Sequence, residues 1–195
     1  MKKNPKLVLA SSSPFRKELL EKIYATFDTA SPDIDESSKP NETPLTLSKR
    51  LATEKASALA INFPDHLIIG SDQVAMLGDR QLTKPGSFEK SIQQLTLSSG
   101  NTITFYTSLC VLNSKTNETI IDTDICSVHM KNLSLEEITN YVKRDKPYGC
   151  AAAFKSEGLG IALFEKIEGD DPNALVGLPL IKLANILNTM GIKVL

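Results

Sequence analysis

The stretch that decides the fold is Leu67-Ile68-Ile69-Gly70-Ser71-Asp72-Gln73-Val74-Ala75-Met76, an apolar run interrupted by an acid and an amide. A short apolar run of this kind is typical of a buried strand. A carboxylate there is unfavourable unless a cation or a reaction needs it, so Asp72 is the first candidate for chemistry. Because neighbouring side chains of a strand point to opposite faces, Asp72 and Gln73 share one cleft only if the pleat breaks near Gly70 or Ser71. A carboxylate that caps a nearby helix or turn is the alternative.

The composition is that of an ordinary globular chain. The 195 residues are 41% hydrophobic and 23% charged, which is enough to bury a core as one domain or two intimate lobes. The formal net charge of -1 provides no basic surface for double-stranded nucleic acid, so a bound polyanion must meet a local cluster of cations or a metal. We therefore expect a small-molecule ligand and no nucleic-acid partner.

The cysteines and the apolar runs indicate the compartment. Cys110, Cys126 and Cys150 are widely spaced, which argues against both a zinc site and a disulfide framework. The apolar run at residues 7–10 is too short for a signal peptide, and no stretch approaches the length of a membrane span. We expect a cytoplasmic protein with no membrane partner.

A predicted strand, a polar loop and a helix start follow one another near the N-terminus. Residues 6–10 form the strand, and a helix capped by Ser13 runs through residues 14–23. This arrangement directs backbone N–H groups and the Ser11 and Ser13 hydroxyls toward whatever lies above the strand, and Arg16 in the first turn opposes the helix dipole unless an anion is present. The pattern favours a phosphate site, with an ordinary capped turn as the alternative.

An acidic loop is the candidate for metal binding. The segment 31–38 carries Asp33, Asp35 and Glu36 and shows little periodicity. If the loop folds toward Asp72, these acids would complete a site of the Mg²⁺ type, in which one or two carboxylates share the ion with substrate phosphates. Solvated surface acids are the alternative.

The next helix begins at residues 43 and 44 and carries Lys55 beside its apolar stripe. Its side chain either extends to solvent, which the sequence favours, or reaches a phosphate. After the central strand, a turn at Gly78 and Asp79 predicts a hairpin that brings Lys84 back toward Asp72.

Further elements are predicted along the rest of the chain: a helix capped by Ser87, paired strands over 102–113 and 119–130 as the framework of a second lobe, a helix opened by a capping box at Ser134, a strand over 160–166 and a last helix over 180–190. In the segment 148–160, small residues surround Lys155 and Glu157, which share a face if the chain is extended there. A ligand contact or a surface ion pair would explain these two charges.

The motifs resemble those of the Maf-like nucleoside triphosphate pyrophosphatases. The matching segments occur in the family's order: 9–16, 35–36, 54–56, 70–74, 84–85 and 154–158. The resemblance implies one Maf-like domain over residues 1–195, with a mixed α/β fold in which a twisted sheet and flanking helices form two lobes around a substrate cleft, as in ITPase-like proteins. It implies hydrolysis between the α and β phosphates of a nucleotide to a monophosphate and diphosphate, and it leaves a homodimer open.

The resemblance also implies roles for individual residues. Asp72 stands at the family's catalytic acid, and Glu36 and Asp72 would hold a Mg²⁺ or Mn²⁺ ion. Because the motifs contain no histidine or cysteine nucleophile, we expect direct attack by water. The expected phosphate contacts are Ser11, Ser13, Arg16, Lys55, Lys84 and Lys155.

Phe15, Gln73 and Glu157 stand at the positions expected to select the base. Members similar to dTTP and UTP pyrophosphatases have Arg, Thr and Gln there, whereas the subgroup acting on 7-methyl-GTP has an aromatic residue (often Trp), Gln and Glu, as this chain does. A 7-methylguanine ring is cationic, so an aromatic face and a carboxylate both favour it, although Phe attracts a cation less strongly than Trp. The expected role is the removal of modified nucleotides.

Two alternatives stay open. The first is a dTTP or UTP pyrophosphatase of the same family. The second is a non-catalytic nucleotide sensor that inhibits septum formation in cell division. The presence of Asp72, Glu36 and the lysines favours an enzyme, because a sensor has no need of the acid and the metal.

Overall fold

The structure is a computed structural model that describes residues 6–195. Within this range the strands are β1 (Lys6–Ala10), β2 (Asp28–Ala30), β3 (His66–Leu77), β4 (Arg80–Leu82), β5 (Thr102–Asn113), β6 (Thr119–Met130) and β7 (Phe164–Glu168). The helices are α1 (Pro14–Glu21), α2 (Pro44–Ala58), α3 (Phe88–Ser98), α4 (Leu135–Asp145) and α5 (Leu180–Thr189), with 3₁₀ turns η1 (Ala151–Ala153) and η2 (Leu159–Leu163).

The strands form one mixed sheet with the order β2-β1-β3-β5-β6-β7, and β4 pairs with β3. β1 is parallel to both β2 and β3, whereas the β3–β4 and β6–β7 pairs are antiparallel. The expected mixed α/β fold is therefore confirmed. No helix within the described range is long and apolar enough to cross a bilayer.

The chain divides into two compact units. Among the described residues, unit 1 contains 6–73, 107–124 and 171–195, and unit 2 contains 74–106 and 125–170. Two lobes were expected, but β5 and β6 do not belong to the second lobe alone as predicted, because each strand contributes residues to both units. At twelve residues each, these strands span roughly 40 Å, about twice the common strand length.

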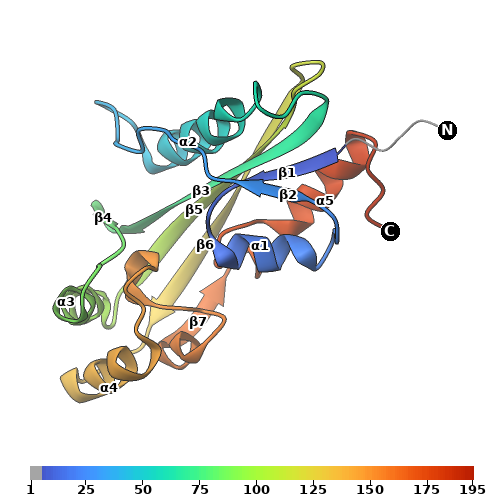
Figure 1. Cartoon of the computed structure of the whole chain (residues 1–195). Helices are drawn as coiled ribbons and strands as arrows, with labels where there is room; N and C mark the ends of the chain where they lie inside the picture. Colours follow the sequence, from blue (N-terminus) through green and yellow to red (C-terminus); the bar gives the residue numbers. More distant parts are fainter. Residues whose placement is uncertain (1–5) are drawn as a thin grey trace. The chain divides into compact units, whose positions relative to one another are not determined.

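In unit 1 the sheet lies between α2 on one face and α1 and α5 on the other (Figure 1). The alternation of the strands explains the two layers: Leu67 and Ile69 pack with Leu183 of α5, whereas Ile68 packs with Ala52 of α2. All five side chains are buried, so the apolar run read from the sequence forms core on both faces.

Gly70 permits the close approach of α2 to β3. A Cβ at this position would lie 2.1 Å from the carbonyl oxygen of Ala52 and 2.8 Å from the amide nitrogen of Ala56. The strand continues through Gly70 without interruption. Its contacts also alternate beyond Gly70, since Asp72 contacts α2 while Gln73 contacts the segment before α5. The break in the pleat that a shared cleft would need is absent, and the two side chains lie on opposite faces.

The helix starts confirm the predicted caps at Ser13, Ser87 and Ser134, and α2 begins where predicted with Thr43 as its cap. The hydroxyls of Ser13, Thr43, Ser87 and Ser134 each accept the backbone N–H three residues further on. These bonds satisfy donors that the first turn of a helix leaves unpaired, which is why the sequence was sufficient to locate these boundaries.

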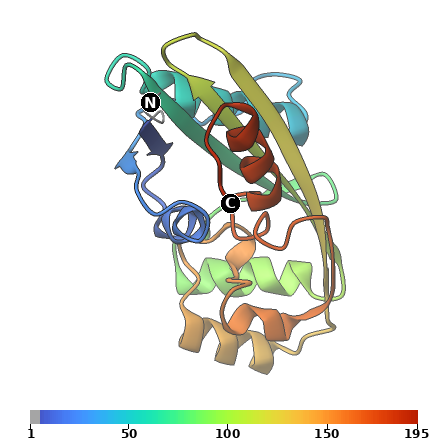
Figure 2. The same cartoon turned by 90° about the vertical axis from the view of Figure 1, so that its right-hand side faces the viewer.

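Unit 2 contains α3 and α4 side by side (Figure 2). An aromatic cluster lies at its core, in which the Phe154 ring makes edge-to-face contacts with Phe105 and Phe164 at centroid distances of 5.6 and 4.7 Å. Such pairs add to the free energy gained from burial alone.

Two predictions for unit 2 are wrong. The strand predicted over residues 160–166 begins only at Phe164, because η2 occupies residues 159–163. A Cβ at Gly160 would lie 2.3 Å from the Lys155 carbonyl oxygen, so the chain turns back tightly where a strand would extend. Residues 151–153 form η1 and residues 156–158 form a turn. Lys155 and Glu157 therefore do not share a face by strand alternation.

Candidate functional site

A lysine between two carboxylates forms the centre of the candidate site in unit 1. The Lys55 ammonium lies 2.6 Å from Asp72 Oδ1 and 2.9 Å from Glu36 Oε1. Lys55 and Asp72 are buried, whereas 61% of the Glu36 side chain is exposed. The expectation that Lys55 extends to solvent is therefore wrong. A buried ammonium needs anionic partners, and the two carboxylates supply them.

Three segments bring these groups together. α2 carries Lys55, β3 carries Asp72, and the loop that follows β2 carries Glu36. Asp72 lies two residues beyond Gly70, the last residue of β3 that pairs with β1. The predicted folding of the acidic loop toward Asp72 is confirmed for Glu36, since both carboxylates contact the same ammonium.

Burial dominates the protonation of Asp72 and Arg16. Loss of hydration raises the pKa of the Asp72 carboxyl, although the nearby charges of Lys55 and Arg16 oppose the shift. Burial lowers the pKa of the Arg16 guanidinium, and the carboxylates of Asp72 and Glu36 oppose that shift. A carboxylate with a raised pKa is a stronger base, which is the property that a proton acceptor requires.

The start of α1 is built as predicted, but its arginine has partners within the protein. Ser11 Oγ accepts the amide N–H of Ser13 at 3.1 Å, and Ser13 Oγ accepts that of Arg16 at 3.4 Å. Arg16 Nε donates to the Gly177 carbonyl at 2.8 Å. Together with the charges of Asp72 and Glu36, these contacts explain an arginine in a first helical turn. Phosphate binding by Ser11, Ser13 and Arg16 stays a prediction, as does a base contact by the half-buried Phe15.

Gln73 is oriented by the segment before α5. Its Nε2 donates to the carbonyl oxygens of Ala174 and Leu175 at 3.0 and 3.1 Å and to Thr107 Oγ1 at 3.0 Å. The reversed amide would place its oxygen against two carbonyl oxygens, so these acceptors fix the side chain with Nε2 toward the loop. Any contact of Gln73 with a base would therefore use Oε1.

Three predicted site residues belong to unit 2. Lys84, Lys155 and Glu157 all lie close enough to Cys150 for their charges to act on its thiol. Lys155 Nζ donates to the Asp145 backbone carbonyl at 2.6 Å, and the Lys155 amide donates to Tyr141 Oη at 3.0 Å. Glu157 is exposed. Unit 2 thus brings Lys84, Lys155 and Glu157 together with the Asp145 carboxylate, and the roles of the three predicted residues toward phosphate and base stay predictions.

The donor set of unit 1 fits a divalent cation of the Mg²⁺ type. Within residues 6–195, no group of three or more histidine, cysteine or acidic residues is placed to hold a metal. However, Asp72 and Glu36 already direct carboxylate oxygens at a single positive centre, the Lys55 ammonium. Mg²⁺ typically takes one or two carboxylates and completes its shell with water and phosphate oxygens.

Two structural residues escaped prediction because each has a partner that is distant in sequence. Asp171, which the sequence placed in a loop, is buried and accepts the Ile181 amide of α5 at 2.6 Å and the Asn173 amide at 2.8 Å. Ser71 Oγ lies 2.9 Å from the carbonyl oxygens of both Ser108 and Gly177. Helix α5 begins after Pro179 without a local side-chain cap, which is the one signal that a remote cap was needed.

The fold and the site define a mixed α/β protein with a buried lysine–carboxylate cluster beside a helix N-terminus. The family model described as "Maf-like protein" matches residues 6–190. The chain therefore belongs to the Maf-like family.

Similar proteins match over nearly their whole length. A protein of Colwellia psychrerythraea is 52% identical over 189 residues, covering 97% of this chain and 94% of that protein. Those of Pseudomonas syringae pv. tomato and Vibrio parahaemolyticus are 50% and 51% identical, covering 97% and 99% of this chain and 99% and 100% of theirs. All three are named "7-methyl-GTP pyrophosphatase". Among solved structures, the Ham1 protein of Staphylococcus aureus aligns with a TM-score of 0.47 at 18% identity, covering 78% of this chain and 88% of that one.

Proposed function

We propose that this protein hydrolyses 7-methyl-GTP to 7-methyl-GMP and diphosphate and so removes a modified nucleotide. The observation that carries the proposal is the identity of about half of all residues with relatives that bear this name, over nearly the full length of both chains. Phe15, Gln73 and Glu157 support it, because an aromatic ring and a carboxylate favour a cationic base over a neutral one.

Asp72 acts in this proposal as the proton acceptor for the attacking water. Lys55 holds Oδ1 at 2.6 Å, so Oδ2 is the atom that we assign to receive the proton. Burial raises the pKa of this carboxyl, which makes it a better base for water that attacks the α-phosphorus. The bond between the α-phosphorus and the bridging oxygen breaks, and diphosphate leaves with the bridging oxygen.

The cations stabilise the charge that develops on the phosphates. Arg16, Lys55, Lys84 and Lys155 are the residues to which we assign this role. Asp72 and Glu36 would hold a Mg²⁺ or Mn²⁺ ion, which when bound supplies Lewis-acid polarisation of the phosphate oxygens.

A screen of diphosphate release over 7-methyl-GTP, GTP, dTTP and UTP tests the proposal. The expected result is the highest kcat/KM for 7-methyl-GTP. A preference for dTTP or UTP would instead establish the first alternative, and nucleotide binding without release of diphosphate from any of them would establish the sensor.

We also propose a cytoplasmic location, keep a homodimer as an open alternative, and propose no nucleic-acid partner. The wide spacing of Cys110, Cys126 and Cys150 in the sequence supports a reducing compartment, and the net charge of -1 argues against binding of nucleic acid. Cell fractionation, sedimentation equilibrium and a gel-shift assay on duplex DNA test these three statements in turn.

A further inference from the structure

One guanidinium joins the acidic loop to helix α2. Arg50 Nε and Nη2 bind the two carboxylate oxygens of Glu42 at 2.5 and 2.9 Å. Nη1 donates to Glu54 Oε2 at 2.8 Å, and Nη2 also donates to the Ser37 carbonyl at 2.9 Å. Only 15% of the Arg50 side chain is exposed. Because the guanidinium is planar and donates to four acceptors, it holds these partners in one geometry.

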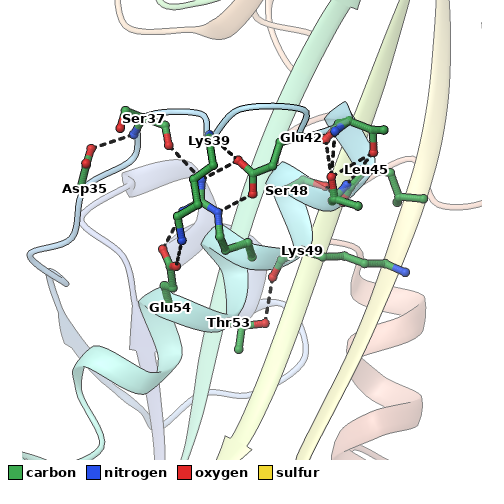
Figure 3. Close-up of polar contacts among 12 residues, drawn as sticks. Asp35, Ser37, Lys39, Glu42, Leu45, Ser48, Lys49, Thr53 and Glu54 are labelled. Atoms are coloured by element: carbon green, nitrogen blue, oxygen red, sulfur yellow. Dashed lines mark hydrogen bonds and ion pairs between the residues drawn. The ribbon is translucent and has the colours of Figure 1, made fainter.

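Lys39 adds further bonds to Glu42 and to Glu54, two of the residues that Arg50 binds (Figure 3). Glu42 Oε2 accepts the Lys39 amide at 2.7 Å, and the Glu42 amide donates back to the Lys39 carbonyl at 3.2 Å. Lys39 Nζ reaches Glu54 Oε1 at 3.2 Å. Residues 31–39 have no regular secondary structure. These side-chain contacts therefore restrain a segment that lacks the backbone hydrogen bonds of a helix or a strand.

The restrained segment carries Glu36. Ser37, whose carbonyl Arg50 holds, directly follows Glu36, and Glu36 Oε1 lies 2.9 Å from Lys55 Nζ. Because 61% of the Glu36 side chain is exposed, packing does little to hold it. The backbone beside Glu36, which Arg50 holds at the Ser37 carbonyl, therefore helps to set where its carboxylate meets Lys55.

We propose that Arg50 is a positioning residue for the reaction: it fastens the segment 31–43 to α2 so that Glu36 stays beside Lys55 and Asp72. This rests on the proposed function, which gives Glu36 its part in turnover. The bidentate bond with Arg50 lowers the pKa of Glu42 to about 2, so the contact persists across the pH range in which the enzyme would work. Lysine cannot replace Arg50, because an ammonium lacks the fork that reaches Glu42, Glu54 and Ser37 together.

Arg50→Lys and Lys49→Arg form a matched pair of variants. Both keep the positive charge at neighbouring positions of α2, but the Lys49 side chain points away from Glu42 and Glu54 (Figure 3). Hydrogen exchange of the Lys39 and Glu42 amides measures the loop directly, without substrate. We expect Arg50→Lys to speed this exchange about tenfold or more, since local opening governs it, and Lys49→Arg to leave it unchanged.

A double-mutant cycle then tests the link to Glu36. In wild type, Arg50→Lys should lower kcat/KM for diphosphate release by roughly tenfold, because small displacements of catalytic groups cost rate. In a Glu36→Gln background the same change should cost less than about twofold, since the group that Arg50 positions has already lost its charge. If Glu36→Gln leaves no measurable turnover, Glu36→Asp serves as the background.

If the Lys39 and Glu42 amides of Arg50→Lys exchange at the wild-type rate, Arg50 does not restrain the loop and the proposal is overturned. Faster exchange with an equal loss of kcat/KM in both backgrounds would show that Arg50 does not act through Glu36, and would overturn the positioning role. If the proposed function itself is wrong, the wild-type protein will release no diphosphate from any nucleotide. The hydrogen-exchange measurement needs no substrate, so it would still show whether Arg50 restrains the loop.

Discussion

Replacing Asp72 by asparagine should remove turnover without destabilising the fold. The change keeps the size of the side chain and an oxygen that accepts from Lys55, while Glu36 remains as the second partner of the ammonium. Burial raises the pKa of Asp72 despite its cations, which means that the neutral form of this carboxyl is more favoured in the folded state than in the unfolded state. A neutral isostere should therefore be tolerated.

The effects of Asp72→Asn on stability and on turnover differ in size. The free energy of unfolding at neutral pH should fall by no more than about 1 kcal/mol, the net contribution of one hydrogen bond, or should increase. The rate of diphosphate release should fall by about a hundredfold or more, because a positioned base typically contributes that much. An enzyme that gains stability when its acid is removed is a known sign of a strained catalytic site.

The pH dependence of the free energy of unfolding checks the direction of the Asp72 pKa shift. Between the unfolded pKa near 3.8 and the higher folded pKa, the folded state of the wild type binds more protons than the unfolded state, so its stability falls as pH rises. Asp72→Asn lacks this titration. The stability of the variant relative to wild type should therefore increase as pH rises through this window.

Urea denaturation from pH 3 to 8 and a diphosphate-release assay measure both quantities. Asp28→Asn, the same chemical change at an exposed position of β2, is the control and should alter neither. A loss of more than about 3 kcal/mol at neutral pH, the size expected when a buried ion pair is broken, would refute the reasoning from burial. Near-normal turnover in the folded variant would show that Asp72 is not the catalytic acid.

Three other predictions concern the metal, the base and the last helix. Chelation should abolish diphosphate release and Mg²⁺ or Mn²⁺ should restore it, since the carboxylates of Asp72 and Glu36 need a hard cation to contact phosphate; full activity in excess chelator contradicts this. Glu157→Gln should lower kcat/KM for 7-methyl-GTP by an amount equivalent to roughly 1.5–3 kcal/mol, and Phe15→Leu by about 0.5–2 kcal/mol. Both variants should lose less kcat/KM for GTP. Equal losses on the two nucleotides would exclude a role of these residues in base recognition. Asp171→Ala should destabilise the fold by roughly 2–3 kcal/mol in urea denaturation, because it leaves the Ile181 and Asn173 amides unpaired; a loss below about 0.5 kcal/mol would show that water replaces the carboxylate.

Local chemistry in the sequence was sufficient to predict much of the fold. The caps at Ser13 and Ser134, the start of α2 at Thr43 and the alternation of β3 each depend on residues within a few positions of one another. Signals of that range are visible in a single chain, because hydrogen bonds at a helix start and the faces of a strand are set by sequence spacing. The family motifs were likewise local, and the Maf-like match confirms them.

The tertiary structure decided what depends on contacts between distant segments. The sequence favoured a solvent-exposed Lys55, but Asp72 and Glu36 meet it from β3 and the acidic loop and keep it buried. The sequence left Asp171 in a loop and gave Arg50 no role, because the groups they bind lie up to thirteen residues away along the chain. A buried charge is stable only where its partners converge, and that convergence is a property of the folded chain that no local spacing encodes.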